Sequence, residues 1–357
     1  MISSHAKAGP GSVKLACRDL WKIYGASPPE AAEIASASSN DGNNSVTGKI
    51  APGHVAAVAG ATLDIHEAEI FVLMGLSGSG KSTLLRCLTR LIEPSYGSVT
   101  LDGEDLLAAD RRRMTDIRRQ AMGMVFQNFG LLPHLTVLDN VAFPLRVQGI
   151  DRAKREARAR EMTELVGLKG REAQYPRELS GGQQQRVGIA RSLAAEPEIW
   201  FLDEPFSALD PMIRRQMQDE FIRLQKMLRK TIVFVTHDVQ EAFRLADRIA
   251  IMRDGAIEQI GTPVEIALSP ANNYIAEFLR DVPLLKVIRA GDVMTPGQGG
   301  ERPSRIFSSA ATLEEILPDL LGGPQSIGIA GPDDTILGEI SPSGITRLLR
   351  GERATTA

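Results

Sequence analysis

Residues 75–82, GLSGSGKS, have the types and spacing of a loop that binds phosphate groups. The loop lies between an apolar run at 70–74, expected to be a buried strand, and residues 81–91, whose leucines recur on one helical face. Glycines let backbone N–H groups turn toward phosphate oxygens, and a helix N-terminus favours a bound anion. Lys81 would hold the outer phosphates and the Ser82 hydroxyl would bind Mg²⁺. The pattern predicts a nucleoside triphosphate site.

Two carboxylates follow a second apolar run. Residues 199–202, IWFL, predict a buried strand that delivers Asp203 and Glu204 at its end. Asp203 is expected to hold Mg²⁺, usually through water, and Glu204 to orient and polarise an attacking water. Paired acids after a strand are also common as helix caps, so the phosphate-binding loop upstream is what favours the catalytic interpretation.

A third motif, LSGGQQQR at residues 179–186, indicates which class of nucleoside triphosphatase the chain resembles. Ser180 could be an ordinary N-cap before a helix that runs to Leu193. The segment also resembles the LSGGQ signature of ABC ATPases, in which this helix N-terminus points at the γ-phosphate of ATP held by the partner subunit. The two interpretations are compatible, because both use the field of the same helix end.

Further residues match that family in chain order. Gln127, directly after a strand expected at 122–126, matches the Q-loop, which senses Mg²⁺ and water and touches membrane partners. His237 matches the switch histidine that contacts the γ-phosphate, and Asp210, in SALD, lies in the D-loop. Tyr24, in KIYG, matches the aromatic residue that stacks on adenine, a contact worth on the order of 1–3 kcal/mol by analogy with base–aromatic stacking.

The resemblance, which covers roughly residues 13–282, thus implies ATP and Mg²⁺ as cofactors and a defined set of site residues. The implied catalytic residues are Glu204, His237, Gln127 and Lys81. The implied metal ligands are Ser82, Gln127 and Asp203. The implied nucleotide-binding residues are Tyr24, Gly75, Ser77, Gly78, Ser79, Gly80, Lys81, Ser82, Thr83, Ser180, Gly181, Gly182, Gln183 and Asp210.

The fold class expected is α/β. Continuous apolar strands that alternate with helices predict a parallel sheet covered on both faces. The resemblance implies a P-loop NTPase (RecA-like) core over residues 1–285, with an N-terminal antiparallel β subdomain and a helical subdomain at about 128–197. The low-complexity stretch 26–52 is expected to be a mobile insertion, although PPEAAEIASA could form a short helix. Residues 286–357 are expected to form a linker and a small α/β module.

The branch of the family that the chain resembles is the importer ATPases for glycine betaine, proline betaine and choline. The resemblance rests on residues 71–83 (FVLMGLSGSGKST), on residues 125–141 (VFQNFGLLPHLTVLDNV) and on the insertion after Tyr24. It implies ATP-driven uptake of a quaternary ammonium compound. Another small solute, such as an amino acid, stays open, because the transported substrate never touches this subunit.

The C-terminal module begins with GDVM at residues 291–294, which resembles the start of a CBS domain. The region has room for one such unit, whereas CBS units work as pairs. Residues 341–344, SPSG, lack the aspartate that nucleotide-binding units usually place there. A dimerisation role and a sensor role are both open for this module.

Composition limits the other functions. Hydrophobic residues make up 43% of the 357, which excludes a wholly disordered chain. The net charge of −3 gives no reason to expect nucleic acid as a partner. The arginines at 111–113, 118 and 119 are expected to form a solvated helix face, answered by Asp110 and Asp116. Cys17 and Cys87 are expected to be buried thiols in a reducing compartment.

No run approaches the roughly 18–20 apolar residues of a membrane helix. A cytoplasmic chain is therefore expected. The resemblance implies a homodimer of ATPase subunits at the cytoplasmic face of the inner membrane, bound to two integral-membrane permease subunits and served by an extracytoplasmic substrate-binding protein.

Two other functions of ABC ATPases fit the sequence less well. A soluble ABC ATPase acting on ribosomes or DNA would usually carry two cassettes or a long coiled coil, and this chain has one cassette and no sustained heptads. A nucleotide-binding regulator without turnover conflicts with the presence of both Glu204 and His237. A transport ATPase is favoured.

Overall fold

The computed structural model of the chain describes residues 11–39, 53–127, 130–207, 209–280, 282–296, 305–322, 326–331 and 333–349. The chain divides into two compact units, one of residues 11–260 and one that contains the residues after 260. The boundary expected from the sequence lies later, between residues 285 and 286. None of the described helices is long and apolar enough to cross a membrane.

The centre of the first unit is a sheet in the order β10-β9-β3-β8-β7-β6. Its strands are β3 (Ile70–Met74), β6 (Met122–Val125), β7 (Ile199–Asp203), β8 (Thr231–Thr236), β9 (Arg248–Arg253) and β10 (Ala256–Gly261). Strand β3 is parallel to β8 and β9, and β7 is parallel to β6 and β8. Every residue of β3, β7 and β8 is buried, as their continuous apolar sequences predict. The predicted parallel sheet is confirmed.

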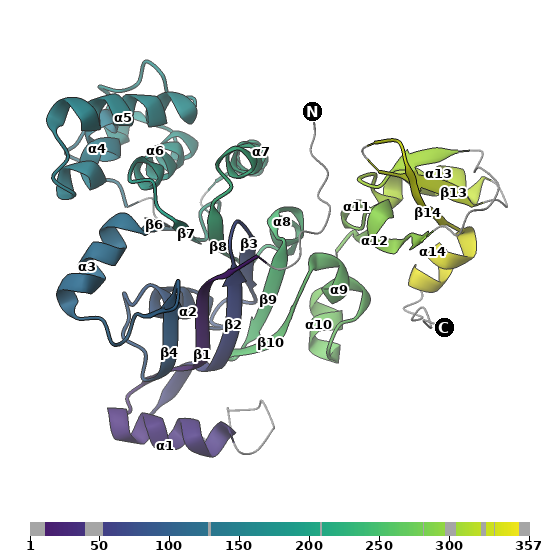
Figure 1. Cartoon of the computed structure of the whole chain (residues 1–357), viewed down its shortest axis with the longest axis horizontal. Helices are drawn as coiled ribbons and strands as arrows, with labels where there is room; N and C mark the ends of the chain where they lie inside the picture. Colours follow the sequence, from purple (N-terminus) through teal and green to yellow (C-terminus); the bar gives the residue numbers. More distant parts are fainter. Residues whose placement is uncertain are drawn as a thin grey trace. The chain divides into compact units, whose positions relative to one another are not determined.

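A second sheet of the same unit has the order β2-β1-β4-β5, and its paired strands are antiparallel. Its strands are β1 (Val13–Tyr24), β2 (Val55–His66), β4 (Tyr96–Leu101) and β5 (Glu104–Asp105). Helix α1 (Pro28–Ser39) packs against β1, β2 and β4 (Figure 1). For residues 28–39, the structure therefore has the short helix that the sequence left as an alternative to a mobile insertion. The remainder of that insertion, 40–52, lies outside the described residues.

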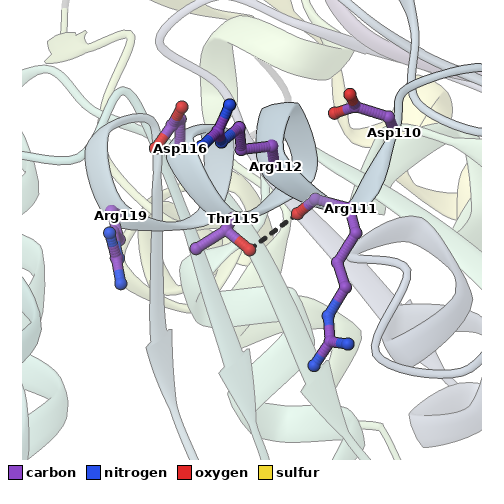
Figure 2. Close-up of a pocket in the computed structure, with 6 residues that line it drawn as sticks. All are labelled: Asp110, Arg111, Arg112, Thr115, Asp116 and Arg119. Carbon is purple, nitrogen blue, oxygen red and sulfur yellow. Dashed lines mark hydrogen bonds between the residues drawn. The ribbon is translucent and has the colours of Figure 1, made fainter.

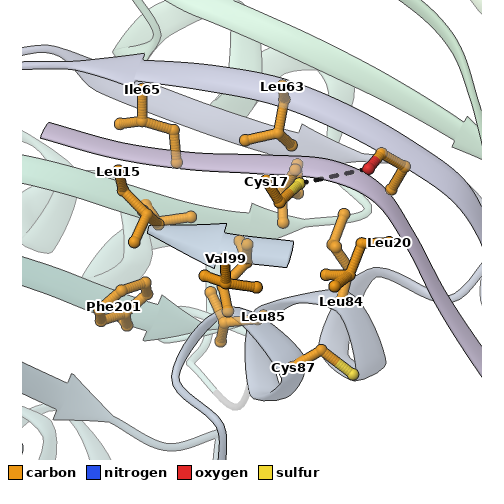
Figure 3. Close-up of a cluster of buried hydrophobic side chains, with 14 of the residues drawn as sticks. Leu15, Cys17, Leu20, Leu63, Ile65, Leu84, Leu85, Cys87, Val99 and Phe201 are labelled. Atoms are coloured by element: carbon orange, nitrogen blue, oxygen red, sulfur yellow. Dashed lines mark hydrogen bonds between the residues drawn. The ribbon is translucent and has the colours of Figure 1, made fainter. Parts of the chain in front are cut away.

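The hydrophobic core of this unit lies between the two sheets and helix α2 (Lys81–Leu88). Leu15, Leu20 and Val99 of the antiparallel sheet meet Leu84 and Leu85 of α2 and the strands of the parallel sheet (Figure 3). Because α2 is anchored in this way, the phosphate-binding loop before it has a fixed end. Other helices of the unit are α3 (Arg111–Gln120), α7 (Pro211–Leu228) and α8 (Val239–Leu245).

A group of helices lies beside β6, in the upper left of Figure 1. It consists of α4 (Val137–Val147), α5 (Arg152–Leu165), the 3₁₀ turn η2 (Pro176–Glu178) and α6 (Gly181–Ala194). Polar side chains start each helix: Thr136 caps α4, Asp151 caps α5 and Ser180 caps α6. This group occupies the stretch for which helices were expected.

The second unit contains its own sheet, in the order β11-β14-β13-β12. The strands are β11 (Thr295–Pro296), β12 (Ile306–Ser308), β13 (Ile327–Ala330) and β14 (Ile336–Ile340). The helices are α9 (Pro263–Leu268), α10 (Asn273–Phe278), α11 (Leu284–Val287), α12 (Ala290–Val293), α13 (Leu313–Leu321) and α14 (Pro342–Leu349). Ile288, Leu313, Ile316 and Ile329 belong to one buried apolar cluster in this unit.

Candidate active site

Four segments with predicted site residues follow neighbouring strands of the central sheet. Strands β3, β8, β7 and β6 are adjacent and parallel, so their carboxyl ends meet at one edge. The phosphate-binding loop follows β3, His237 follows β8, Glu204 follows β7, and Gln127 lies two residues after β6. This edge of an α/β sheet is where such folds bind ligands.

The glycines of the loop are placed where a side chain would not fit. Gly80 has φ +97°, and a Cβ there would lie 2.1 Å from the carbonyl oxygen of Ala57 on β2. A Cβ at Gly75 would lie 2.3 Å from the Met252 carbonyl oxygen on β9. Gly78 also has a positive φ, of +83°, but faces open space. The loop is thus held closely against β2 and β9 at its ends and is open at its tip, where Ser77 is also exposed.

The end of the loop is also hydrogen bonded to the β9–β10 turn. The Gly255 N–H, in the turn between β9 and β10, donates to the Ser79 carbonyl oxygen at 3.1 Å. Gly255 in turn accepts from the Ala59 N–H at 2.9 Å. Ser79 itself is buried.

The Lys81 ammonium occupies the inside of the loop. It donates to the carbonyl oxygens of Gly75 (2.9 Å) and Leu76 (2.8 Å), and its side chain is buried. Burial lowers the pKa of Lys81, and the nearby carboxylates of Glu204 and Asp203 oppose that shift. A buried cation that makes hydrogen bonds only to neutral groups is poised to receive an anion.

Ser82 and Asp203 are in direct contact. The Ser82 hydroxyl donates to Oδ1 of Asp203 at 2.6 Å, and Asp203 is almost fully buried. The other carboxylate oxygen, Oδ2, lies 3.3 Å from the Arg86 guanidinium. Sequence reasoning missed Arg86, although its place four residues after Ser82 on the same helix is a signal that could have found it. Thr83, next along α2, is half-buried.

Glu204 turns away from Asp203. Its backbone has φ +46°, a conformation that is uncommon outside glycine and that is typical of functional sites. Its N–H donates to the Val235 carbonyl oxygen of β8 at 3.1 Å, which holds the turn. The side chain lies 3.2 Å from Nδ1 of His237 and 3.5 Å from Nε2 of Gln127. His237 and Gln127, which follow β8 and β6, therefore both lie against the carboxylate of Glu204, which follows β7.

The signature segment starts α6 with a closed capping box. The Ser180 side chain accepts from the Gln183 N–H at 3.4 Å, and the Gln183 side chain accepts from the Ser180 N–H at 3.0 Å. A Cβ at Gly182 would lie 2.7 Å from Cγ2 of Ile213 on α7, whereas Gly181 has room. Asp210 caps α7, accepting from the N–H groups of Met212 and Ile213. Ala208 of the D-loop is outside the described residues.

Tyr24 stands at the end of β1, and its side chain is partly exposed. The Lys22 ammonium lies 5.1 Å from the centroid of its ring and donates to the Glu93 carbonyl oxygen at 2.8 Å. Tyr24 pairs with Val55 of β2, two residues from the Ala57 carbonyl that packs on Gly80. The paired strands thus connect the tyrosine to the phosphate-binding loop. Sequence reasoning did not single out Lys22 as a contact of Tyr24.

The arginine-rich segment forms helix α3, as expected, and its arginines also have partners outside the helix. Asp110 caps the helix through the Arg113 N–H, and the Arg113 guanidinium makes two hydrogen bonds to Glu104. Arg118 donates to backbone carbonyls. A surface hollow on this helix is lined by Asp110, Arg111, Arg112, Thr115, Asp116 and Arg119 (Figure 2). None of the predicted site residues lies in it.

Comparison with known proteins agrees with this geometry. The family model described as ABC transporter matches residues 58–207. The trimethylamine N-oxide transport system ATP-binding protein TmoW of Ruegeria pomeroyi is 49% identical over 339 residues, which cover 95% of this chain and 98% of that protein. The glycine betaine/proline betaine transport system ATP-binding protein ProV of Escherichia coli is 47% identical over 283 residues, 79% of this chain and 70% of that protein.

A solved structure gives the same result for the fold. The dimeric ATP-binding cassette MJ0796, bound to ADP and phosphate, is 34% identical to this chain. It superposes with a TM-score of 0.58 and covers 70% of this chain and 98% of its own. Sequence, fold and the converging site residues agree, and the chain belongs to the ABC transporter family as an ATP-binding, ATP-hydrolysing subunit.

Proposed function

We propose that this chain drives uptake of a small molecule with a fully methylated nitrogen, by coupling ATP hydrolysis to the movement of two membrane permease subunits. The observation that carries the catalytic part is the meeting of Gln127, Glu204 and His237 beside the phosphate-binding loop. Two copies of the chain would act together at the cytoplasmic face of the membrane, and a substrate-binding protein outside would deliver the cargo.

Glu204 is assigned as the residue that orients and polarises the attacking water. A carboxylate needs to be fixed in place for that role, and His237 and Gln127 both lie within reach of it. His237 would also contact the γ-phosphate once ATP is bound. The Lys81 ammonium would exchange its two carbonyl partners for phosphate oxygens, a stronger, charge-assisted contact.

Ser82 and Asp203 are assigned to Mg²⁺. A serine hydroxyl and a carboxylate 2.6 Å apart supply the oxygen ligands that this hard cation prefers, and phosphate and water would be its further ligands. Gln127 would add its amide oxygen. When bound, the ion would neutralise charge that develops on the transferred phosphate. Arg86 would orient Asp203 through its second oxygen.

The cargo class follows from how far the similarity extends. The relatives that align with 92–95% of the chain, and with 95–98% of their own length, are named for transport of trimethylamine N-oxide. The glycine betaine relatives leave about a fifth of this chain unmatched. Trimethylamine N-oxide and glycine betaine share a nitrogen bearing three methyl groups, which aromatic side chains of a binding protein recognise through cation–π contact. We therefore favour trimethylamine N-oxide as the cargo.

The test is transport into vesicles that contain the chain with its permease subunits and binding protein. Trimethylamine N-oxide should be taken up with ATP inside, and the Glu204→Gln variant should take up none. If glycine betaine or choline is taken up in preference to trimethylamine N-oxide, the cargo is that quaternary ammonium compound and the proposal of trimethylamine N-oxide is wrong. Uptake of an amino acid alone would overturn the cargo class while leaving the ATPase assignment standing.

The second unit is proposed to hold a single CBS-like module that regulates the transporter or pairs its subunits. The chain order β12, α13, β13, β14, α14, with β12 parallel to β13 and β13 antiparallel to β14, supports this. A chain that lacks residues 286–357 should hydrolyse ATP at about the full-length rate but give transport with a changed salt dependence, because salt screens charge contacts beyond about 8–10 Å. An unchanged salt dependence would leave the module a packing role.

A further inference from the structure

Helix α1, which the chain inserts directly after Tyr24, rests on the outer face of the antiparallel sheet. Its Ala31 and Ala35 are fully buried, and they share one apolar cluster with Trp21 and Ile23 of β1 and Ala59 of β2. The two fully buried residues on the helix side are alanines, with the partly buried Ile34 packed beside them, so the helix backbone approaches the sheet closely at Ala31 and Ala35. Such a contact tolerates no larger side chain without displacement of the helix.

The helix is too short to be stable by itself, so its position depends on this contact. Its first turn is fixed by Glu30, whose carboxylate accepts from the N–H and the hydroxyl of Ser27. Twelve residues with this composition would be marginal as an isolated helix in water. The sheet therefore stabilises the helix and, by the same contacts, the helix restrains the end of β1.

Tyr24 is the last residue of β1, the strand end that α1 restrains. Ile23, its neighbour, is buried under α1, and only residues 25–27 separate the tyrosine from the helix. Gly25 has φ +90°, and a Cβ there would lie 2.6 Å from the Gly53 carbonyl oxygen, so the two ends of the insertion touch next to Tyr24. The ring itself is partly exposed. Its orientation is consequently set by its backbone, together with the Lys22 ammonium that lies over the ring.

We propose that α1 is a positioning element for nucleotide recognition: by clamping Trp21 and Ile23 it holds Tyr24 at the angle at which the ring stacks on a purine base. This rests on the proposed role of Tyr24. The triphosphate is held elsewhere, by the loop between β3 and α2. The insertion therefore acts on the affinity for the base and leaves phosphate binding and the catalytic step unchanged.

The experiment compares two neighbouring substitutions on α1 in the full chain. Ala35→Glu places a charge in the buried contact, whereas the matched control Ser36→Glu places it on the exposed side of the same helix turn. A second variant removes residues 26–52 and joins Gly25 to Gly53, which the structure places in contact. KM for ATP, kcat at saturating ATP and the affinity for inorganic tripolyphosphate are measured for each.

Ala35→Glu and the deletion should each raise KM for ATP about tenfold, the size of one base–aromatic stack, with kcat and tripolyphosphate affinity within about twofold of the unmodified chain. Ser36→Glu should change none of the three. A loss of tripolyphosphate affinity to the same extent as ATP would show general destabilisation. An unchanged KM for ATP in the deletion variant would overturn the proposal, since that variant has no α1.

The Tyr24→Ala variant distinguishes the positioning role of α1 from the stacking role of Tyr24, on which it rests. It should raise KM for ATP by a similar factor, and adding the deletion to it should have no further effect, because both act on one contact. If Tyr24→Ala leaves KM unchanged, the stacking role of Tyr24 fails. If it raises KM while the α1 variants do not, only the positioning role of α1 fails. Additive effects of the two changes would also overturn that role.

Discussion

Helices α2 and α6 begin in opposite ways, although both start with glycine-rich segments. At α2 the N-cap is Gly80 in a left-handed conformation, and no side chain caps the first N–H groups. At α6 the cap is Ser180, and a reciprocal capping box with Gln183 pairs the Gln183 N–H. The α2 terminus thus presents unpaired donors inside a loop that β2 and β9 hold in place. At the α6 terminus the capping box already pairs the N–H of Gln183 without a ligand.

This difference gives the two helix N-termini different roles in binding phosphate. A helix N-terminus with free N–H groups favours a bound anion, and a side-chain cap already satisfies one of those groups. We therefore expect α2 to bind ATP in a single subunit. We expect α6 to add affinity only when a second subunit brings a γ-phosphate to Ser180.

The largest expected effect is on the rate of ATP hydrolysis, measured apart from nucleotide binding at the helix N-termini. Glu204→Gln should lower kcat by on the order of 10²–10³-fold or more, because the group that polarises water is lost, while ATP still binds at α2. Phosphate release and nucleotide affinity measure the two. Glu198→Gln, at the other end of β7, is the control and should stay within about twofold. Turnover near the unmodified rate in Glu204→Gln would refute the assignment.

The same variant tests the α6 terminus. Since hydrolysis is blocked, ATP should hold Glu204→Gln as a dimer, and ADP should not, because only the γ-phosphate would reach Ser180 of the other subunit. Sedimentation with each nucleotide gives the answer. An equal association state in both would contradict the role given to α6.

A pair of glycines tests how firmly the α2 terminus is held. Gly80→Ala should destabilise the fold by several kcal/mol, because its Cβ would lie 2.1 Å from the Ala57 carbonyl oxygen. Gly78→Ala meets open space and should cost only the left-handed conformation, roughly 1–2 kcal/mol. Thermal unfolding without nucleotide measures both. Equal losses would mean that the clash relaxes and that the loop is not clamped.

Removing the cap of α6 should have a smaller effect. Ser180→Ala should cost about 1 kcal/mol of stability and leave ATP affinity of the single subunit unchanged, but weaken the ATP-dependent dimer of the Glu204→Gln variant about tenfold. Thr136→Ala removes a comparable cap, from α4, and should lower stability alone. If both substitutions affect the dimer alike, Ser180 acts only as a cap.

The smallest expected effect is on the reactivity of the buried cysteines next to and on α2. Cys87 on α2 and Cys17 on β1 are buried in the core between the sheets, and burial raises the pKa of each thiol to about 12 (Figure 3). At pH 8 only about one thiol in 10⁴ would be ionised, so iodoacetamide should modify neither in the folded chain. Gly80→Ala should speed reaction at Cys87 if it loosens α2. Fast alkylation of the unmodified chain would contradict the anchored core.

Order and spacing along the chain were enough to predict much of this protein. Each of the main predictions depends on one short segment. The loop at 75–82 indicates free N–H groups for phosphate, residues 199–204 indicate a strand that ends in carboxylates, and the apolar runs indicate buried strands. The strands, the parallel sheet and the family were therefore predicted correctly. The same local reasoning also named the arginine-rich helix.

Only the tertiary structure decided which of these residues meet. The contact of Glu204 with His237 and Gln127 depends on strand order, and that order places β7 between β6 and β8. The pairing of Arg113 with Glu104, in place of a neighbour on its own helix, depends on β5 lying nearby. Helix α1 forms where composition also allowed a mobile loop, because its two buried alanines find a surface to cover. Contacts between residues far apart in sequence leave no periodic pattern, and so they become visible only once the chain is folded.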